Sequence, residues 1–167
     1  MAWDLDLSAL EHVVGKRLVG ASRIVYEHDG ATDVSCGDLE IAFSEGEVVL
    51  LGVAGDGERL RVQEGAWRDP FAPPLSPENE AFVQRSGKHI RLSALAVAPT
   101  LPVGDIFVRY LPIRNRFGTL AGVRLVFAGS AVRFLVECDE AYVLTPEDPR
   151  FTEWGFTEDD AFTTPVA

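Results

Sequence analysis

Apolar and polar residues alternate through most of residues 18–63, which is the period of strands that bury one face. Glycine and acidic residues separate the alternating runs, as is typical of tight turns. The apolar positions are Ile24 and Tyr26, then Leu39, Ile41 and Phe43, then Val49, Leu51 and Val53, then Leu60 and Val62. The pattern predicts four strands connected as an antiparallel meander.

A similar pattern returns in residues 102–144 at a nearly constant spacing. Val19, Gly20, Ile24, Tyr26, Leu39, Ile41 and Phe43 match residues 84 positions later, at Val103, Gly104, Val108, Tyr110, Val123, Leu125 and Phe127. After a one-residue deletion, Gly46, Val49, Leu51, Val53 and Asp56 match Gly129, Val132, Phe134, Val136 and Asp139. Aliphatic matches occur between any two meanders, so the tyrosine, phenylalanine and glycine identities carry the comparison. We expect an internal repeat that forms a pseudo-two-fold sandwich or a closed barrel.

Two short helices complete the predicted fold. A helix is expected near residues 8–14, where Ser8 can cap the first turn and a glycine follows. The two halves are joined by residues 69–87, which begin as a proline-rich extended linker and continue as a helix near 77–86. With 167 residues, 47% of them apolar, the chain suits one mainly β (α+β) domain over residues 1–167.

The chain is strongly acidic, with 26 Asp and Glu against 15 Lys and Arg and a net charge of −11. Such a surface repels phosphate backbones and anionic headgroups, so we expect no nucleic-acid or membrane partner. The first residues carry acids where a signal peptide carries lysines, which predicts a soluble cytoplasmic protein. Cys36 and Cys138 form no CxxC pair, and both are predicted to be buried, reduced and far apart.

No residue pattern indicates a catalytic centre, a metal site or a cofactor. The three histidines lack a second histidine or cysteine at metal-ligand spacing. Ser35 and Ser86 lie in no Gly-x-Ser-x-Gly motif, and the glycine-rich residues 52–57 lack the lysine of a phosphate loop. These absences favour a binding protein, with an enzyme of unrecognised site as a third alternative.

Acidic residues crowd the C-terminal third beside a tryptophan. The candidate partner-binding residues are Asp139, Glu140, Trp154, Glu158, Asp159 and Asp160. An acidic face with an aromatic anchor resembles protein-docking surfaces in kind, although a solvated acidic tail explains the same residues. The leading hypothesis is an acidic protein-binding module, such as an inhibitor or immunity protein for a more basic partner.

A basic and aromatic patch suggests a function of another class. Its residues are Arg109, Tyr110, Arg114 and Arg116. Arginine side chains on a strand can bind an anionic small molecule through their planar guanidinium groups, here between the two repeats. The structural alternative is that these arginines cover apolar surface with their stems and pair with neighbouring acids.

Overall fold

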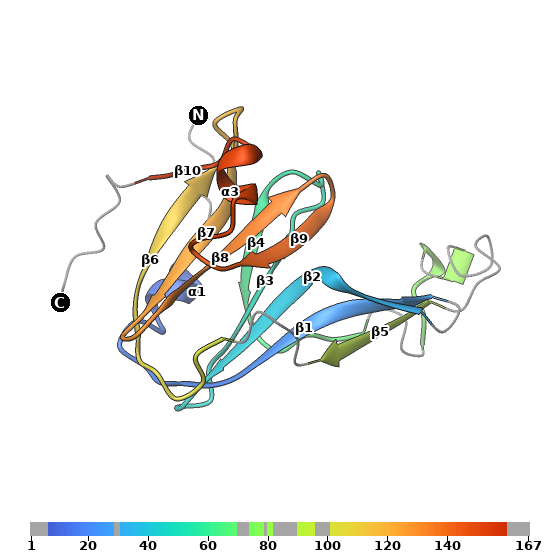
Figure 1. Cartoon of the computed structure of the whole chain (residues 1–167). Helices are drawn as coiled ribbons and strands as arrows, with labels where there is room; N and C mark the ends of the chain where they lie inside the picture. The colour runs from blue at the N-terminus through green and yellow to red at the C-terminus, as the bar shows by residue number, and fades with distance from the viewer. Residues whose placement is uncertain are drawn as a thin grey trace.

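Two antiparallel β-sheets form the protein in the computed structural model, which describes residues 7–28, 31–69, 74–78, 80–81, 90–95 and 101–159. The first sheet has the order β4-β3-β2-β1-β5 and consists of β1 (Leu18–His28), β2 (Ala31–Phe43), β3 (Val48–Val53), β4 (Leu60–Glu64) and β5 (Ile90–Leu95). The second has the order β10-β6-β7-β8-β9 and consists of β6 (Phe107–Arg114), β7 (Leu120–Phe127), β8 (Ala131–Glu137), β9 (Glu140–Leu144) and β10 (Thr157–Glu158). The predicted mainly β fold of antiparallel strands is confirmed (Figure 1).

The two sheets bury their inner faces against each other in one shared core. Ile41 and Leu51 of the first sheet and Leu125 and Phe134 of the second have no exposed surface. These residues occupy alternate positions along their strands, as the sequence pattern predicts. Burying each such side chain stabilises the fold by roughly 1.5–3 kcal/mol.

The sheets do not close into a barrel, so that alternative is wrong. The only isolated bridge within the described chain joins Arg17 and Ile106, the residues just before β1 and β6. β5 lies beside β1 and β10 lies beside β6, so each meander's first strand already has an outer neighbour over part of its length. Figure 1 shows β1 and β2 extending together away from the second sheet, with β5 alongside.

The structure does not show the predicted internal repeat. Ile41 and Leu125 were expected to be counterparts, but Ile41 pairs with Ala21 whereas Leu125 pairs with Tyr110. Tyr26 is therefore not the counterpart of Tyr110 in the strand register. Both β1 and β6 contain register shifts at bulges, and alternation alone cannot reveal where a bulge occurs.

The first helix is shorter than predicted. α1 covers Ser8–Glu11, and Leu7 rather than Ser8 occupies its N-cap, without a side-chain capping bond. Gly15 follows the turn after α1 at a φ of 87°, in keeping with the expected stop. A second short helix, α3 (Arg150–Glu153), lies near the C-terminus.

The predicted linker and second helix lie partly outside the described residues. Residues 77, 78, 80 and 81 are helical, and the Glu80 N–H donates to the carbonyl of Ser76 at 2.9 Å. Residues 70–73 and 82–89 are not among those described. No helix in the described segments is long and apolar enough to cross a membrane.

The two cysteines differ, which corrects one prediction. Cys36 is buried, as expected, whereas Cys138 is exposed. Cys138 lies in the turn between β8 and β9 at a φ of 50°, where the backbone turns outward instead of continuing the strand. Neither thiol forms a disulfide.

Candidate functional site

Two of the predicted partner-binding acids are held by arginines of the same chain. Glu158 on β10 accepts hydrogen bonds from Arg124 at 3.2 Å and from Arg133 at 2.8 Å, and its side chain is only 15% exposed. The Asp159 carboxylate lies 3.8 Å from Nε of Arg114. Glu158 therefore neutralises arginines on the outer face of the second sheet, and Asp159 neutralises Arg114 at the end of β6. Asp160 lies outside the described residues.

Trp154 belongs to an apolar cover over that same outer face. Its ring lies 5.1 Å from the ring of Tyr142, and the Arg150 guanidinium lies 5.6 Å from its centroid. Together with Phe151 it packs on a small cluster that includes the buried Phe156. The predicted aromatic anchor is thus half-buried against its own sheet.

Asp139 and Glu140 lie elsewhere, in the turn between β8 and β9 and at the start of β9. The Asp139 N–H donates to the carbonyl of Gly57, in the turn between β3 and β4, at 3.0 Å. Gly57 has a φ of 76°, and a Cβ there would lie 1.6 Å from an Asp139 carboxylate oxygen. Only glycine suits this contact, which joins one hairpin tip of each sheet.

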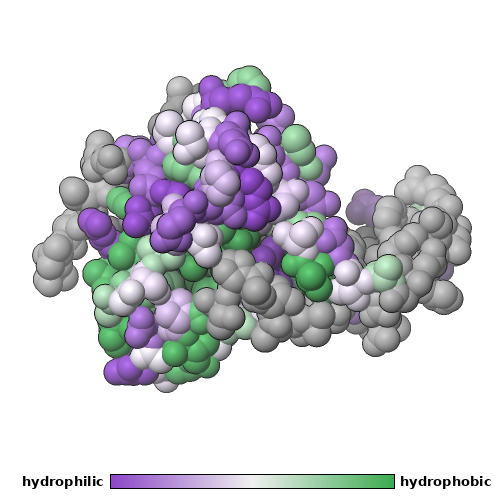
Figure 2. Space-filling view, in the orientation of Figure 1, coloured by the Kyte–Doolittle hydropathy of each residue, from purple (hydrophilic) through white to green (hydrophobic). Residues whose placement is uncertain are grey.

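The joined tips gather carboxylates that come from both sheets. This surface, here called the acidic end, consists of the tip residues Asp56, Glu58, Glu137, Asp139 and Glu140 together with Asp33 on β2, which shares the contact of Cys36 with Glu140; all are exposed or half-exposed. Among the described bases beside it, Arg59 pairs with Asp56, so the negative charge is only partly balanced. Figure 2 shows hydrophilic residues over the upper part of the body, whereas more apolar residues gather at its lower end.

Cys36 lies under the acidic end and is not suited to be a nucleophile. Burial raises the pKa of its thiol to about 12, and contacts with the carboxylates of Glu140 and Asp33 add to the shift. The thiolate, which is the reactive form, is therefore scarce at neutral pH. Asp33 itself accepts bonds from the Ser35 hydroxyl at 2.6 Å and the Ser35 N–H at 3.0 Å, which lower its pKa.

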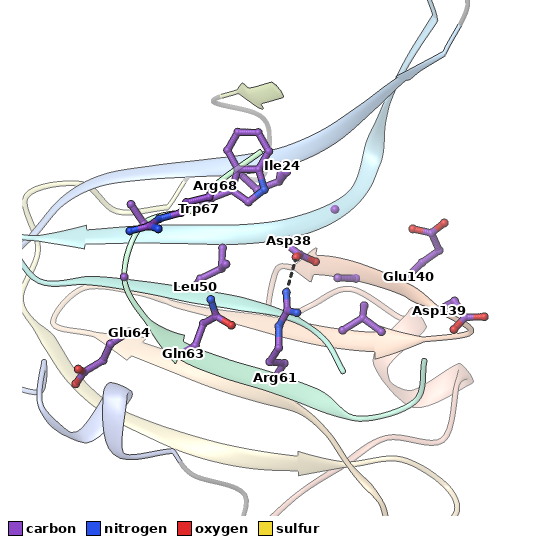
Figure 3. A pocket seen from close by; sticks show the side chains of 15 residues that line it. Ile24, Asp38, Leu50, Arg61, Gln63, Glu64, Trp67, Arg68, Asp139 and Glu140 are labelled. Atoms are coloured by element: carbon purple, nitrogen blue, oxygen red, sulfur yellow. Dashed lines mark hydrogen bonds and ion pairs between the residues drawn. The ribbon is translucent and has the colours of Figure 1, made fainter. Parts of the chain in front are cut away.

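A groove of about 690 Å³ runs along the outer face of the first sheet and ends at the acidic end. Apolar residues Ile24, Leu50, Val53, Ala66 and Trp67 contribute to its lining together with the charged residues Asp38, Arg61, Glu64, Arg68, Asp139 and Glu140. The segment after β4 turns back across the sheet, and its Trp67 N–H donates to the Glu40 carboxylate at 2.7 Å. Figure 3 shows Asp139 and Glu140 at one end of the groove and Trp67 on the side away from Arg61.

Asp38 lies near the middle of this groove in a niche made by a glycine. A Cβ at Gly52 would lie 2.7 Å from the Asp38 carboxylate, so the absence of a side chain there leaves the carboxylate its space. The Val53 N–H donates to it, and Nη2 of Arg61 lies 3.4 Å away. Burial nevertheless raises the pKa of Asp38, a contribution larger than the opposing one from Arg61.

Arg23 fixes the same region from the inner side. It is 3% exposed and donates two bonds to the Gly37 carbonyl, at 3.1 and 2.8 Å, and one to the Ala141 carbonyl at 3.0 Å. Burial lowers its pKa. The guanidinium thus joins β9 to the first sheet directly beneath the acidic end.

The predicted basic patch is not brought together between the sheets. Tyr110 is a core residue with 2% exposure, whereas Arg109, the preceding residue of the strand, is exposed. Arg114 donates to the carbonyl of Gly118 at 3.0 Å, and the Arg116 guanidinium lies 4.9 Å from the ring centroid of Phe117. These two arginines belong to the β6–β7 hairpin tip.

Sequence reasoning missed the groove and its central residue. Asp38 and Arg61 occupy outward positions on their strands, and the alternating pattern identifies only the buried, inward positions. The signal that could have found them is Gly52 inside a strand, because glycine there often marks a close approach by another group. Within the described residues, no three histidines, cysteines or carboxylates are arranged to hold a metal ion.

Comparisons of the chain with protein-family models, with curated proteins and with solved structures found no match.

Proposed function

We propose that this chain is a protein-binding module that captures a basic partner through the acidic end. The observation that carries the proposal is the contact of the two hairpin tips, Asp139 on Gly57, which brings exposed carboxylates of both sheets onto one surface. Like charges held together create a field that attracts a basic surface and speeds its association. An inhibitor or immunity protein that covers a basic site on its target is the role that fits such a surface.

The groove beside the acidic end supports the same function more than binding of an anionic small molecule. Four of its lining residues are acids, Asp38, Glu64, Asp139 and Glu140, against the two arginines 61 and 68. A groove of this charge repels phosphates and carboxylates. It favours cationic side chains whose apolar stems can contact the apolar part of the lining.

Charge reversal tests the proposal with a matched control. The variant carries Asp139→Lys and Glu140→Lys. The control carries Glu147→Lys and Glu153→Lys, two exposed acids just before and at the end of α3 that enter no ion pair among the described residues. Both changes shift the net charge equally, so an effect confined to the first variant belongs to the acidic end. The partner is recovered from cells that make the chain, identified and purified, and its association is followed by stopped-flow fluorescence.

The expected result is an association rate that falls at least about tenfold in the first variant and changes little in the control. Added salt should slow the unaltered chain, since a Debye length of roughly 10 Å at 0.1 M screens the attraction. An equal effect in both variants, or a rate indifferent to salt, would contradict the proposal.

A further inference from the structure

The groove presents one carboxylate in a setting that a solvated surface acid lacks. The Asp38 carboxylate accepts a hydrogen bond from the Val53 N–H and occupies the space that Gly52 leaves because it has no side chain. The Asp38 side chain is 26% exposed. A carboxylate fixed in this way needs no further ordering when a cation approaches, which lowers the entropic cost of binding. Asp38 is therefore a preorganised acceptor that faces the groove.

The present partner of Asp38 is weakly held. Arg61 reaches it through one contact at 3.4 Å, and the Arg61 side chain is 46% exposed. An exposed single-contact ion pair contributes little to stability, so an incoming cation can replace it at small cost. Arg61 would then turn into solvent beside the groove.

The surroundings of Asp38 match an arginine side chain better than a lysine. Two parallel N–H groups of a guanidinium can bind both carboxylate oxygens, which an ammonium cannot do. Leu50 and Trp67 line the same groove and offer apolar surface for the methylene stem, and an indole face also attracts a guanidinium. The Glu140 carboxylate lies close enough to Asp38 to interact with it electrostatically, so it adds to the negative charge that a guanidinium in the groove would meet.

We infer that the groove binds an arginine of an extended segment of the partner protein, with the guanidinium on Asp38 and the stem along Leu50 and Trp67. This inference rests on the proposed capture of a basic partner and names what the groove recognises in it. The groove recognises a positive charge at one position of the partner, whereas the acidic end attracts the partner as a whole. Apolar residues on either side of the arginine would contact Ile24 and Val53.

The test uses the full chain labelled with ¹⁵N and three peptides, acetyl-Leu-Arg-Leu-amide and its lysine and citrulline analogues. Binding is read from the amide shifts of Gly52 and Val53, which adjoin the Asp38 carboxylate. We expect the arginine peptide to bind most tightly, lysine less tightly, and citrulline, which has the shape of arginine without its charge, at least about tenfold more weakly.

Three variants separate recognition by Asp38 from general attraction to an acidic protein. Asp38→Asn keeps the side-chain shape and should weaken binding of the arginine peptide about tenfold. The control Glu153→Gln removes an equal charge from an exposed site at the end of α3 and should leave that binding unchanged. Arg61→Gln removes the competing cation and should strengthen binding several-fold. The Arg61 variant keeps the inference testable if Asp38→Asn does not fold.

Several outcomes would overturn the inference. They are equal binding of the arginine and citrulline peptides, equal losses in Asp38→Asn and Glu153→Gln, and no gain in Arg61→Gln. Failure of the two proposals can be told apart. If the arginine peptide binds but charge reversal at Asp139 and Glu140 does not slow association with the partner, the groove site stands and the proposed capture through the acidic end fails. If charge reversal slows association but the arginine peptide does not bind, only the groove site fails.

Discussion

The outer faces of the two sheets use the same residue types in opposite ways. On the second sheet, α3 and the following Phe156 cover the face, and Glu158 on the edge strand β10 binds Arg124 and Arg133. On the first sheet, the described cover is the short segment around Trp67, and Asp38 faces an open groove. Glu158 is thus neutralised within the chain, while Asp38 on the first sheet stays accessible to another molecule.

The difference teaches that acidic residues indicate a partner only where their own chain does not neutralise them. The sequence groups Glu158 and Asp139 in one acidic third, yet Glu158 bonds to two arginines and Asp139 is exposed at a turn. Trp154 likewise anchors the chain's own tail. The binding surface must therefore be sought on the first sheet and at the joined hairpin tips.

The largest expected effect comes from removing the apolar cover of the second sheet. Phe156 is 4% exposed, so Phe156→Ala should lower the free energy of unfolding by about 3 kcal/mol through lost burial and a cavity. Phe117, 73% exposed, provides the control, and Phe117→Ala should change stability by no more than about 0.5 kcal/mol. Urea unfolding measures both. Similar values for the two variants would show that the tail is not a structural cover.

A smaller loss is expected from removing the charge that holds the cover. Glu158→Gln leaves Arg124 and Arg133 without their carboxylate, and we expect a loss of about 2 kcal/mol, below the roughly 3–5 kcal/mol of a fully buried pair. Association with the basic partner should not change. A variant that keeps its stability but loses partner association would reverse the comparison and return Glu158 to the binding surface.

The strands of residues 18–64 and 107–144 could be predicted from sequence because each is defined by its own local alternation, as in Leu39 and Ile41, whereas the edge strands β5 and β10 were not predicted. The functional surface could not, because it depends on which charges meet across the fold. Glu158 is 34 residues from Arg124, and no local pattern connects them. The register of β1 was equally hidden, since bulges change strand pairing without changing the alternation of nearby residues.

The contact of the two hairpin tips predicts a difference between two glycines. Gly57 and Gly46 both have positive φ, at 76° and 90°, so alanine at either position costs about 1 kcal/mol of backbone strain. Only at Gly57 does the new methyl also meet Asp139, which should add roughly 1 kcal/mol or more. The double variant Gly57→Ala, Asp139→Gly should remove this extra loss in thermal unfolding. Equal losses at both glycines would mean that the tips do not touch.

The smallest expected effect concerns the two thiols. Cys36 of the first sheet is buried under the acidic end, and Cys138 of the second sheet is exposed beside it. At pH 8, the exposed Cys138 should react with a disulfide reagent at once, whereas Cys36, with a pKa of about 12, should react only after unfolding.

The pKa of Cys36 in the folded chain exceeds the free value of roughly 8.5, so the stability gained by keeping this thiol neutral is present below that pH. It is lost as the pH rises toward 12, because the unfolded thiol ionises first. Urea unfolding at pH 8 and pH 10 should therefore show a steeper decline for the unaltered chain than for Cys36→Ala. Rapid labelling of both thiols in the folded chain, or identical pH slopes, would place Cys36 at the surface and would contradict its contact with Glu140 at the start of β9.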